Sequence, residues 1–210
     1  MISVIPRINS NNQYTPNFTS AKYRKVAQTF DDSFYSSQPV KIVKKLFNYS
    51  DDTNSARIKS YSGPMAKNAG MSTEAGGYGG GWLKGSLDTP LSTTDVHTCA
   101  LLNLVNADTF KQLLFHVFDD TSVHKIENFI KKIFPDFTHV NIVGGDQFKT
   151  VNTMRKIVDA VDNVNPYAPK TFYETICENP QLVAYNGEIS YIKGKSGQVS
   201  FVQDTENYLY

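Results

Sequence analysis

The chain has 210 residues, which is enough for one ordinary domain with some additional sequence, or for two small domains. Its formal net charge is +1, so it lacks the basic field that would hold nucleic acid or an anionic membrane surface. No apolar run reaches the length of a bilayer-spanning helix, and residues 1–20 lack the apolar segment of a Sec signal peptide.

The first part of the chain divides by composition. Residues 1–20 are rich in Asn, Ser, Thr and Pro, which predicts a disordered polar leader. Residues 21–85 are predicted to form a helical extension and a connection, because apolar residues within 40–47 recur at helical spacing. The Gly-rich stretch at 62–81 fits a linker better than a lid over a site.

Residues 86–210 have the denser pattern of a folded catalytic domain. The apolar runs "ALLNLV" (100–105) and "QLLFHVF" (112–118) flank Asn and Asp, which favour turns, and together they predict an antiparallel hairpin. A helix is predicted from Ser122, whose side chain can cap it, to a stop at Pro135.

The remaining elements complete an α+β fold. A strand at 138–143 leads into Gly144–Gly145, and a second amphipathic helix follows at 148–161. Asn186–Gly187 predicts a hairpin with a type I′ turn, and 197–204 reads as a last strand. We therefore expect a layered α/β sandwich of mixed and antiparallel sheets with flanking helices, rather than a doubly wound parallel sheet.

One cysteine and one histidine are brought together by the predicted hairpin. If its turn centres on Ala107 and Asp108, Cys99 lies directly opposite His116 on the same sheet face. An imidazole beside a thiol can take its proton and lower its pKa, which makes a nucleophile. A third group must orient the imidazole, and the local candidates are Thr93, Thr94, Asp95 and Asp119.

Other readings of the same residues stay open. Free cysteine is among the most buried residue types, so an inert core position for Cys99 competes with a catalytic one. His97 is a reserve base, and the backbone N–H groups of Thr98 and Cys99 could form an oxyanion hole. Cys99, His97 and His116 lack the usual sequence spacing of zinc ligands, so no metal or other cofactor is expected.

The region 86–202 resembles CheD, the family of chemotaxis receptor glutamine deamidases, and more distantly the catalytic domain of cytotoxic necrotizing factor toxins. Thr93 precedes Cys99 by six positions and His116 follows it by seventeen. Both spacings match those of the family's Thr, Cys and His. "VNIVGGDQF" resembles the family's strand and Gly-Gly turn, and Asn152 is similar to an Asn that begins the next helix. The family's Gly-Ser before the cysteine is His97–Thr98 here.

The resemblance implies a deamidase with Cys99 as nucleophile, His116 as acid and base, and Thr93 as the group that orients His116. Thr98, His97, Gly144 and Gly145 would line the oxyanion and substrate region. The implied partner is a protein that presents an exposed glutamine, with no nucleic acid and no membrane span; the oligomeric state is left open.

The polar leader favours a bacterial effector that is made in the cytoplasm and secreted into a host cell without a Sec signal. A cytoplasmic chemotaxis deamidase is the alternative within this class. A transglutaminase or cysteine protease would use the same Cys–His pair, and a binding module would keep the fold with an inactive site.

Overall fold

The structure of the protein is a computed structural model. It describes residues 55–68, 80–94, 96–145, 150–173 and 181–192. The predicted leader at 1–20, the helix at 40–47 and the strand at 197–204 therefore lie outside the described residues, as does Cys177.

The described residues form an α+β fold with two mixed sheets and two helices. In one sheet, six strands lie in the order β1 (Ser55–Ala56), β9 (Lys170–Tyr173), β8 (His139–Gly144), β6 (Ala100–Asn106), β7 (Lys111–Val117) and β4 (Trp82–Ser86). In the other, five strands lie in the order β2 (Lys59–Ser60), β11 (Glu188–Ile192), β10 (Gln181–Tyr185), β5 (Leu91–Thr93) and β3 (Lys67–Asn68). The helices are α3 (Val123–Ile133) and α4 (Thr150–Val164).

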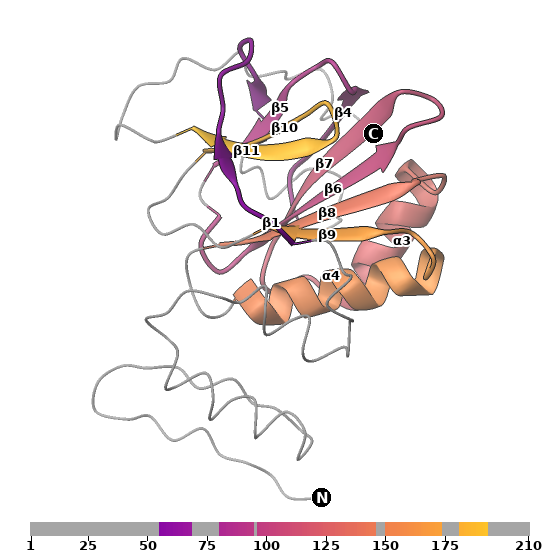
Figure 1. The fold of residues 1–210 in the computed structure, drawn as a ribbon. Helices are drawn as coiled ribbons and strands as arrows, with labels where there is room; N and C mark the ends of the chain where they lie inside the picture. The colour runs from indigo at the N-terminus through magenta and orange to yellow at the C-terminus, as the bar shows by residue number, and fades with distance from the viewer. Residues whose placement is uncertain (1–54, 69–79, 95, 146–149, 174–180, 193–210) are drawn as a thin grey trace, which may run out of the picture.

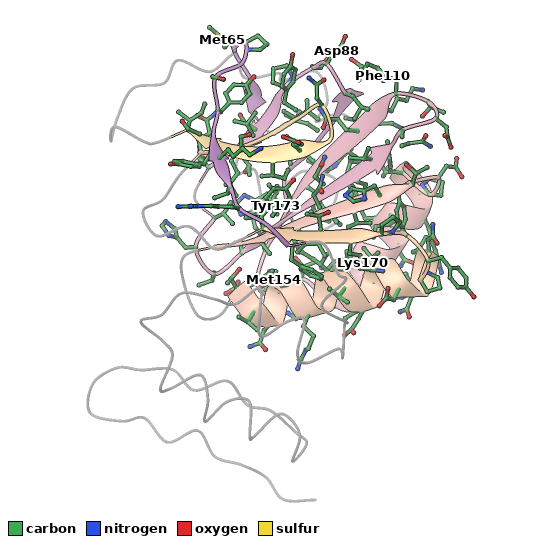
Figure 2. All side chains as sticks on the ribbon, viewed as in Figure 1. Met65, Asp88, Phe110, Met154, Lys170 and Tyr173 are labelled. Atoms are coloured by element: carbon green, nitrogen blue, oxygen red, sulfur yellow. The ribbon has the colours of Figure 1, made fainter. Side chains whose placement is uncertain are left out.

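The six-stranded sheet is the middle layer of the fold (Figure 1). On one face, Leu102 and Phe115 pack with Phe129 of α3 and Met154 of α4 in a continuous apolar core. Figure 2 shows Met154 on the side of α4 that faces this sheet. On the other face, side chains that include Leu101 meet the five-stranded sheet in a second core. Alternate residues of each central strand thus serve opposite cores, as the two-residue period of a strand requires.

The helices predicted from Ser122 and at 148–161 are confirmed where the structure describes them. The side chain of Ser122 caps α3 by accepting a hydrogen bond from the Lys125 N–H at 3.3 Å. Helix α4 buries the expected face, with Met154, Ile157 and Val161 fully covered. Neither of the helices among the described residues is long and apolar enough to cross a membrane.

The hairpin of β10 and β11 is also confirmed. Tyr185 pairs with Glu188, and the two residues between them have positive φ angles, 50° at Asn186 and 76° at Gly187. These are the angles that a type I′ turn requires at both central positions, and Asn-Gly adopts them most readily.

The hairpin of β6 and β7 forms as predicted, but its register is different. Asn106 pairs with Lys111, so the turn has four residues, and Leu101 rather than Cys99 lies opposite His116. The longer turn is stabilised locally, because the Thr109 N–H donates to Asn106 Oδ1 at 2.9 Å. The change moves the pairing by two residues, which keeps every side chain on its predicted face.

The expected extension at 21–85 is wrong for its described part. Residues 55–86 contribute strands β1 to β4, which pair with β9, β11, β5 and β7 respectively. The first three strands have two residues each, too short to show an alternating pattern in the sequence. This part of the chain therefore belongs to the same sheets as residues 86–192.

Phe110, the last residue of the four-residue turn, offers a test of local strain. Phe110 has a φ of 55° although it carries a side chain. The residue, labelled in Figure 2, is 53% exposed. Replacing Phe110 with glycine should raise the free energy of unfolding by about 1 kcal/mol, because glycine adopts this angle without strain. Urea denaturation measures the change. Thr109→Gly in the same turn is the control and should lower stability; a Phe110→Gly protein that is equally destabilised would contradict the prediction.

Candidate functional site

A buried hydrogen bond between a threonine and a histidine joins the two sheets. Thr93 ends β5 of the five-stranded sheet, and His116 lies near the end of β7 in the six-stranded sheet. The Thr93 Oγ1 and His116 Nδ1 atoms are 2.8 Å apart, and both residues are fully buried. The structure thus brings together two of the three residues predicted for the Cys–His–Thr site.

This contact decides which ring nitrogen of His116 can do acid–base chemistry. A neutral imidazole carries one proton, so Nε2 can accept a proton only while Nδ1 carries one and donates it to Thr93. The Thr93 hydroxyl then directs its own proton to the Thr94 carbonyl, in a long contact of 3.5 Å. Nε2 itself is shielded from solvent. Thr93 can therefore hold His116 in the tautomer that a general base needs.

Cys99 lies immediately before β6, on the face of the sheet that carries His116. It is half-buried and packs against the core between the two sheets. The predicted position directly opposite His116 is corrected to a diagonal one, because Leu101 takes the opposite place. Diagonal neighbours in an antiparallel pair lie about 7–8 Å apart, which remains within reach of a long side chain.

The surroundings of Cys99 raise the pKa of its thiol, contrary to the lowered pKa expected from a neighbouring imidazole. Burial is the main cause, and the carboxylates of Asp119 and Asp120 add to it by repelling a thiolate. Hydrogen bonds from the Thr98 side chain and the Asp119 backbone N–H act in the opposite direction. At neutral pH the Cys99 side chain is therefore a thiol, and to act as a nucleophile it would need a base during attack.

The backbone on either side of Cys99 is fixed by two threonines of α4. The Thr150 hydroxyl donates to the Cys99 carbonyl at 2.5 Å and accepts from the Gly145 N–H at 2.7 Å. The Thr153 hydroxyl donates to the Thr98 carbonyl at 3.0 Å. Because the described peptide bonds are all trans, the Cys99 N–H points away from α4, on the side opposite to the Thr98 carbonyl.

Gly144 and Gly145, predicted to line the substrate region, are packed inside the structure. A Cβ on Gly145 would lie 2.1 Å from the His97 carbonyl oxygen, and one on Gly144 would lie 2.7 Å from the Met154 sulfur. The Gly145 N–H is already bonded to Thr150. In this structure Gly145 lets the segment before Cys99 approach the end of β8, and Gly144 lets α4 approach it. Contact of either glycine with a substrate remains a prediction.

The end of the Gly-rich stretch runs beside His116. The His116 N–H donates to the Gly81 carbonyl at 2.8 Å, and a Cβ on Gly80 would lie 1.8 Å from the His116 carbonyl oxygen. Gly80 and Gly81 are both buried. Here the glycines allow close backbone packing next to the site, whereas residues 69–79 lie outside the described ranges.

The other predicted site residues take different places. His97 and Thr98 are half-buried in the segment that leads to Cys99, and Asn152 is half-buried in α4. Asp119, one of the four local candidates for orienting the histidine, is instead near Cys99, and Asp95 is outside the described residues. Within the described part of the chain, no group of three or more His, Cys, Asp or Glu side chains could hold a metal ion.

Three residues of this region were missed by the sequence analysis: Thr150, Thr153 and Lys156 of α4. Each bonds a backbone carbonyl far away in the chain. Their spacing of three residues along a helix was visible, but threonine and lysine at such a spacing are common on ordinary helices. No signal in the sequence pointed to their partners.

No protein-family model matches the chain, and no curated protein matches it.

Substitution of Thr93 tests the bond between the sheets. Thr93→Val keeps the shape of the side chain but leaves the buried Nδ1 of His116 facing two methyl groups. We expect the free energy of unfolding to fall by about 1–3 kcal/mol, the usual cost of a buried polar group that loses its partner. Urea denaturation measures it. Thr93→Ser, which keeps the hydroxyl, is the matched control and should lose less; equal losses would show that the hydroxyl is not the stabilising group.

The carboxylates beside Cys99 give a pH prediction. Asp119 and Asp120 raise the pKa of the thiol, so Asp120→Asn should lower it toward its ordinary value. The pH profile of Cys99 alkylation by iodoacetamide, followed by mass spectrometry, should then move to lower pH. Asp136→Asn is the control, because Asp136 lies beside Asn106 at the other end of β6. An unchanged profile in Asp120→Asn would mean that this carboxylate does not act on the thiol.

Proposed function

We propose that the chain is a cysteine-dependent deamidase, which converts a glutamine side chain of a target protein to glutamate through a thioester. The observation that carries the proposal is the buried 2.8 Å contact between Thr93 and His116, with Cys99 on the same sheet face. The sequence spacing of these residues resembles that of CheD, and the layered arrangement of two sheets and two helices is compatible with that family's fold.

The proposed reaction divides the hydrolysis of an amide into two steps. The Cys99 thiol gives its proton to His116 Nε2 as the sulfur attacks the glutamine carboxamide carbon. His116 then returns the proton to the departing nitrogen, and ammonia leaves behind a thioester. Water, deprotonated by His116, attacks the thioester, and the products are glutamate and the regenerated thiol.

The environment of Cys99 sets the expected pH dependence. Because burial and two carboxylates raise the pKa of the thiol, little thiolate exists near neutral pH. Proton transfer to His116 during attack is therefore essential, and the rate should rise with pH as the thiol ionises. The backbone N–H of Cys99, which points away from α4, is the candidate donor to the developing oxyanion.

A non-catalytic binding module is the second candidate, and the raised thiol pKa is the observation that favours it. A thiol that stays protonated, on the same sheet face as a fully buried imidazole, also suits a site that is held for stability rather than for chemistry. A transglutaminase or protease with the same residues would give different products, namely amine incorporation or chain cleavage.

The setting proposed for the deamidase is a bacterial effector acting on a host protein, as the polar residues 1–20 suggest. A chemotaxis deamidase that acts on a receptor in the same cell is the alternative. In both cases the substrate is a folded protein whose exposed glutamine must reach Cys99.

Ammonia release from glutamine-bearing proteins tests the proposed function. Full-length protein is incubated with casein and with a soluble lysate of eukaryotic cells, and ammonia, cleavage and amine incorporation are measured separately. We expect Cys99→Ser and His116→Ala to lower ammonia release by about a thousandfold, since each removes a reacting group. Cys177→Ser is the matched control and should retain the rate.

The outcomes separate the candidate functions. Ammonia release that depends on Cys99 supports a deamidase, whereas incorporated amine or cleaved chains would assign one of the other thiol enzymes. Ammonia release that is equal in the wild type and Cys99→Ser would rule out Cys99 as the nucleophile. No product of any kind, with an unreactive Cys99, would leave the binding module as the better proposal.

A further inference from the structure

Helix α4 contacts the region around Cys99 through a third side chain besides its two threonines. Lys156 follows Thr153 by three residues, on the same side of the helix. Its ammonium donates to the backbone carbonyl of Asp119 at 2.6 Å. The three α4 side chains therefore hold both segments that flank the thiol, the one leading into β6 and the one leaving β7.

The segment that Lys156 holds is a tight turn after β7. The Thr121 N–H donates to the Phe118 carbonyl at 3.1 Å, which closes a four-residue turn with Asp119 at its second position. The Asp119 N–H forms a hydrogen bond with the Cys99 sulfur that favours the thiolate. Lys156 and the thiol thus contact the same residue of the turn, one through its carbonyl and the other through its N–H.

The position of Lys156 has an energetic cost that its contacts offset. Its side chain is half-buried, and burial lowers the pKa of the ammonium, while the carboxylates of Asp119 and Asp120 raise it. A charged group held in such a place usually has a defined partner, and here the partner is the Asp119 carbonyl. The arrangement fits an anchor for the turn better than a solvated surface lysine.

We propose that Lys156 is a positioning residue that controls the reactivity of Cys99 by holding the Phe118–Thr121 turn, so that the Asp119 N–H faces the sulfur. A hydrogen bond from a fixed N–H stabilises the thiolate against the burial and the carboxylates that oppose it. For catalysis, the inference rests on the proposed function, in which the same N–H would stabilise the thiolate released when the thioester is hydrolysed.

Alkylation of Cys99 by iodoacetamide tests this role without any substrate. The pH profile is followed by mass spectrometry on the full chain for the wild type, Lys156→Met and Lys156→Arg. We expect Lys156→Met to shift the profile to higher pH and to slow alkylation near neutral pH by about twofold to tenfold, the effect of one weakened hydrogen bond. Lys156→Arg keeps a charged donor and should restore most of the rate.

Two controls distinguish a positioning role of Lys156 from the effect of its charge and from an effect on protein stability. Arg155→Met removes the same charge at the neighbouring position of α4, and it should leave the profile in place. Thermal unfolding is measured for each variant, because a purely structural lysine would lower the melting temperature without moving the pH profile. An unchanged profile in Lys156→Met, or an equal shift in Arg155→Met, would overturn the proposal.

A second pair of variants tests the N–H directly if Lys156→Met does not fold. Asp119→Pro removes the donor at a turn position where proline is favoured, whereas Asp119→Ala removes the same carboxylate and keeps the N–H. The proline variant should be alkylated only at higher pH than the alanine variant, and coincident profiles would contradict the inference. A shift in the alkylation profile without ammonia release from casein or lysate would uphold the role of Lys156 and count against the deamidase. Ammonia release without a shift in that profile would support the deamidase and count against the role of Lys156.

Discussion

The six-stranded sheet is covered on both faces, and this constraint governs the rest of the structure. Every residue of β6 is buried, because helices pack on one face and the second sheet packs on the other. A polar side chain between the sheets must therefore find a partner within the protein, or it destabilises the fold. Gln112 donates to the Thr89 carbonyl at 2.8 Å, and Asn141 donates to Asn103 at the same distance. The contact between Thr93 and His116 satisfies the same requirement and also fixes the imidazole.

The position of Cys99 at the rim of this buried layer explains the conflict in its electrostatics. The layer excludes water from His116, which strengthens any hydrogen bond to the ring. The same burial penalises a thiolate at Cys99, and the carboxylates of Asp119 and Asp120 add repulsion. Hydrogen-bond donors from Thr98 and the Asp119 backbone favour the anion. The proposed role of Lys156 addresses this balance, because a firmly held Asp119 N–H would favour the anion.

Helix α4 holds the two segments that flank Cys99, and its role illustrates how far a sequence pattern reaches. The apolar spacing of Met154, Ile157 and Val161 predicted the helix and the face that it buries, because both depend on local periodicity. The bonds of Thr150 and Lys156 to the carbonyls of Cys99 and Asp119 span parts of the chain that only the assembled fold brings together. Backbone carbonyls are chemically the same at every position, so the sequence does not indicate which carbonyl will accept the hydrogen bond.

Sequence patterns alone predicted the α+β class, both described helices, the Asn186–Gly187 turn and the shared face of Cys99 and His116. Each of these follows from short-range chemistry: side-chain period, helix capping and the φ angles that Asn and Gly tolerate. The tertiary structure decided the register of the β6–β7 hairpin, because a four-residue turn stabilised by Asn106 replaced the predicted shorter one. It also decided that β1 to β4 join the two sheets, since two-residue strands have no period to detect. The raised pKa of Cys99 likewise depends on burial and on the carboxylates of Asp119 and Asp120, which lie twenty and twenty-one residues away in the chain, and no local pattern encodes this proximity.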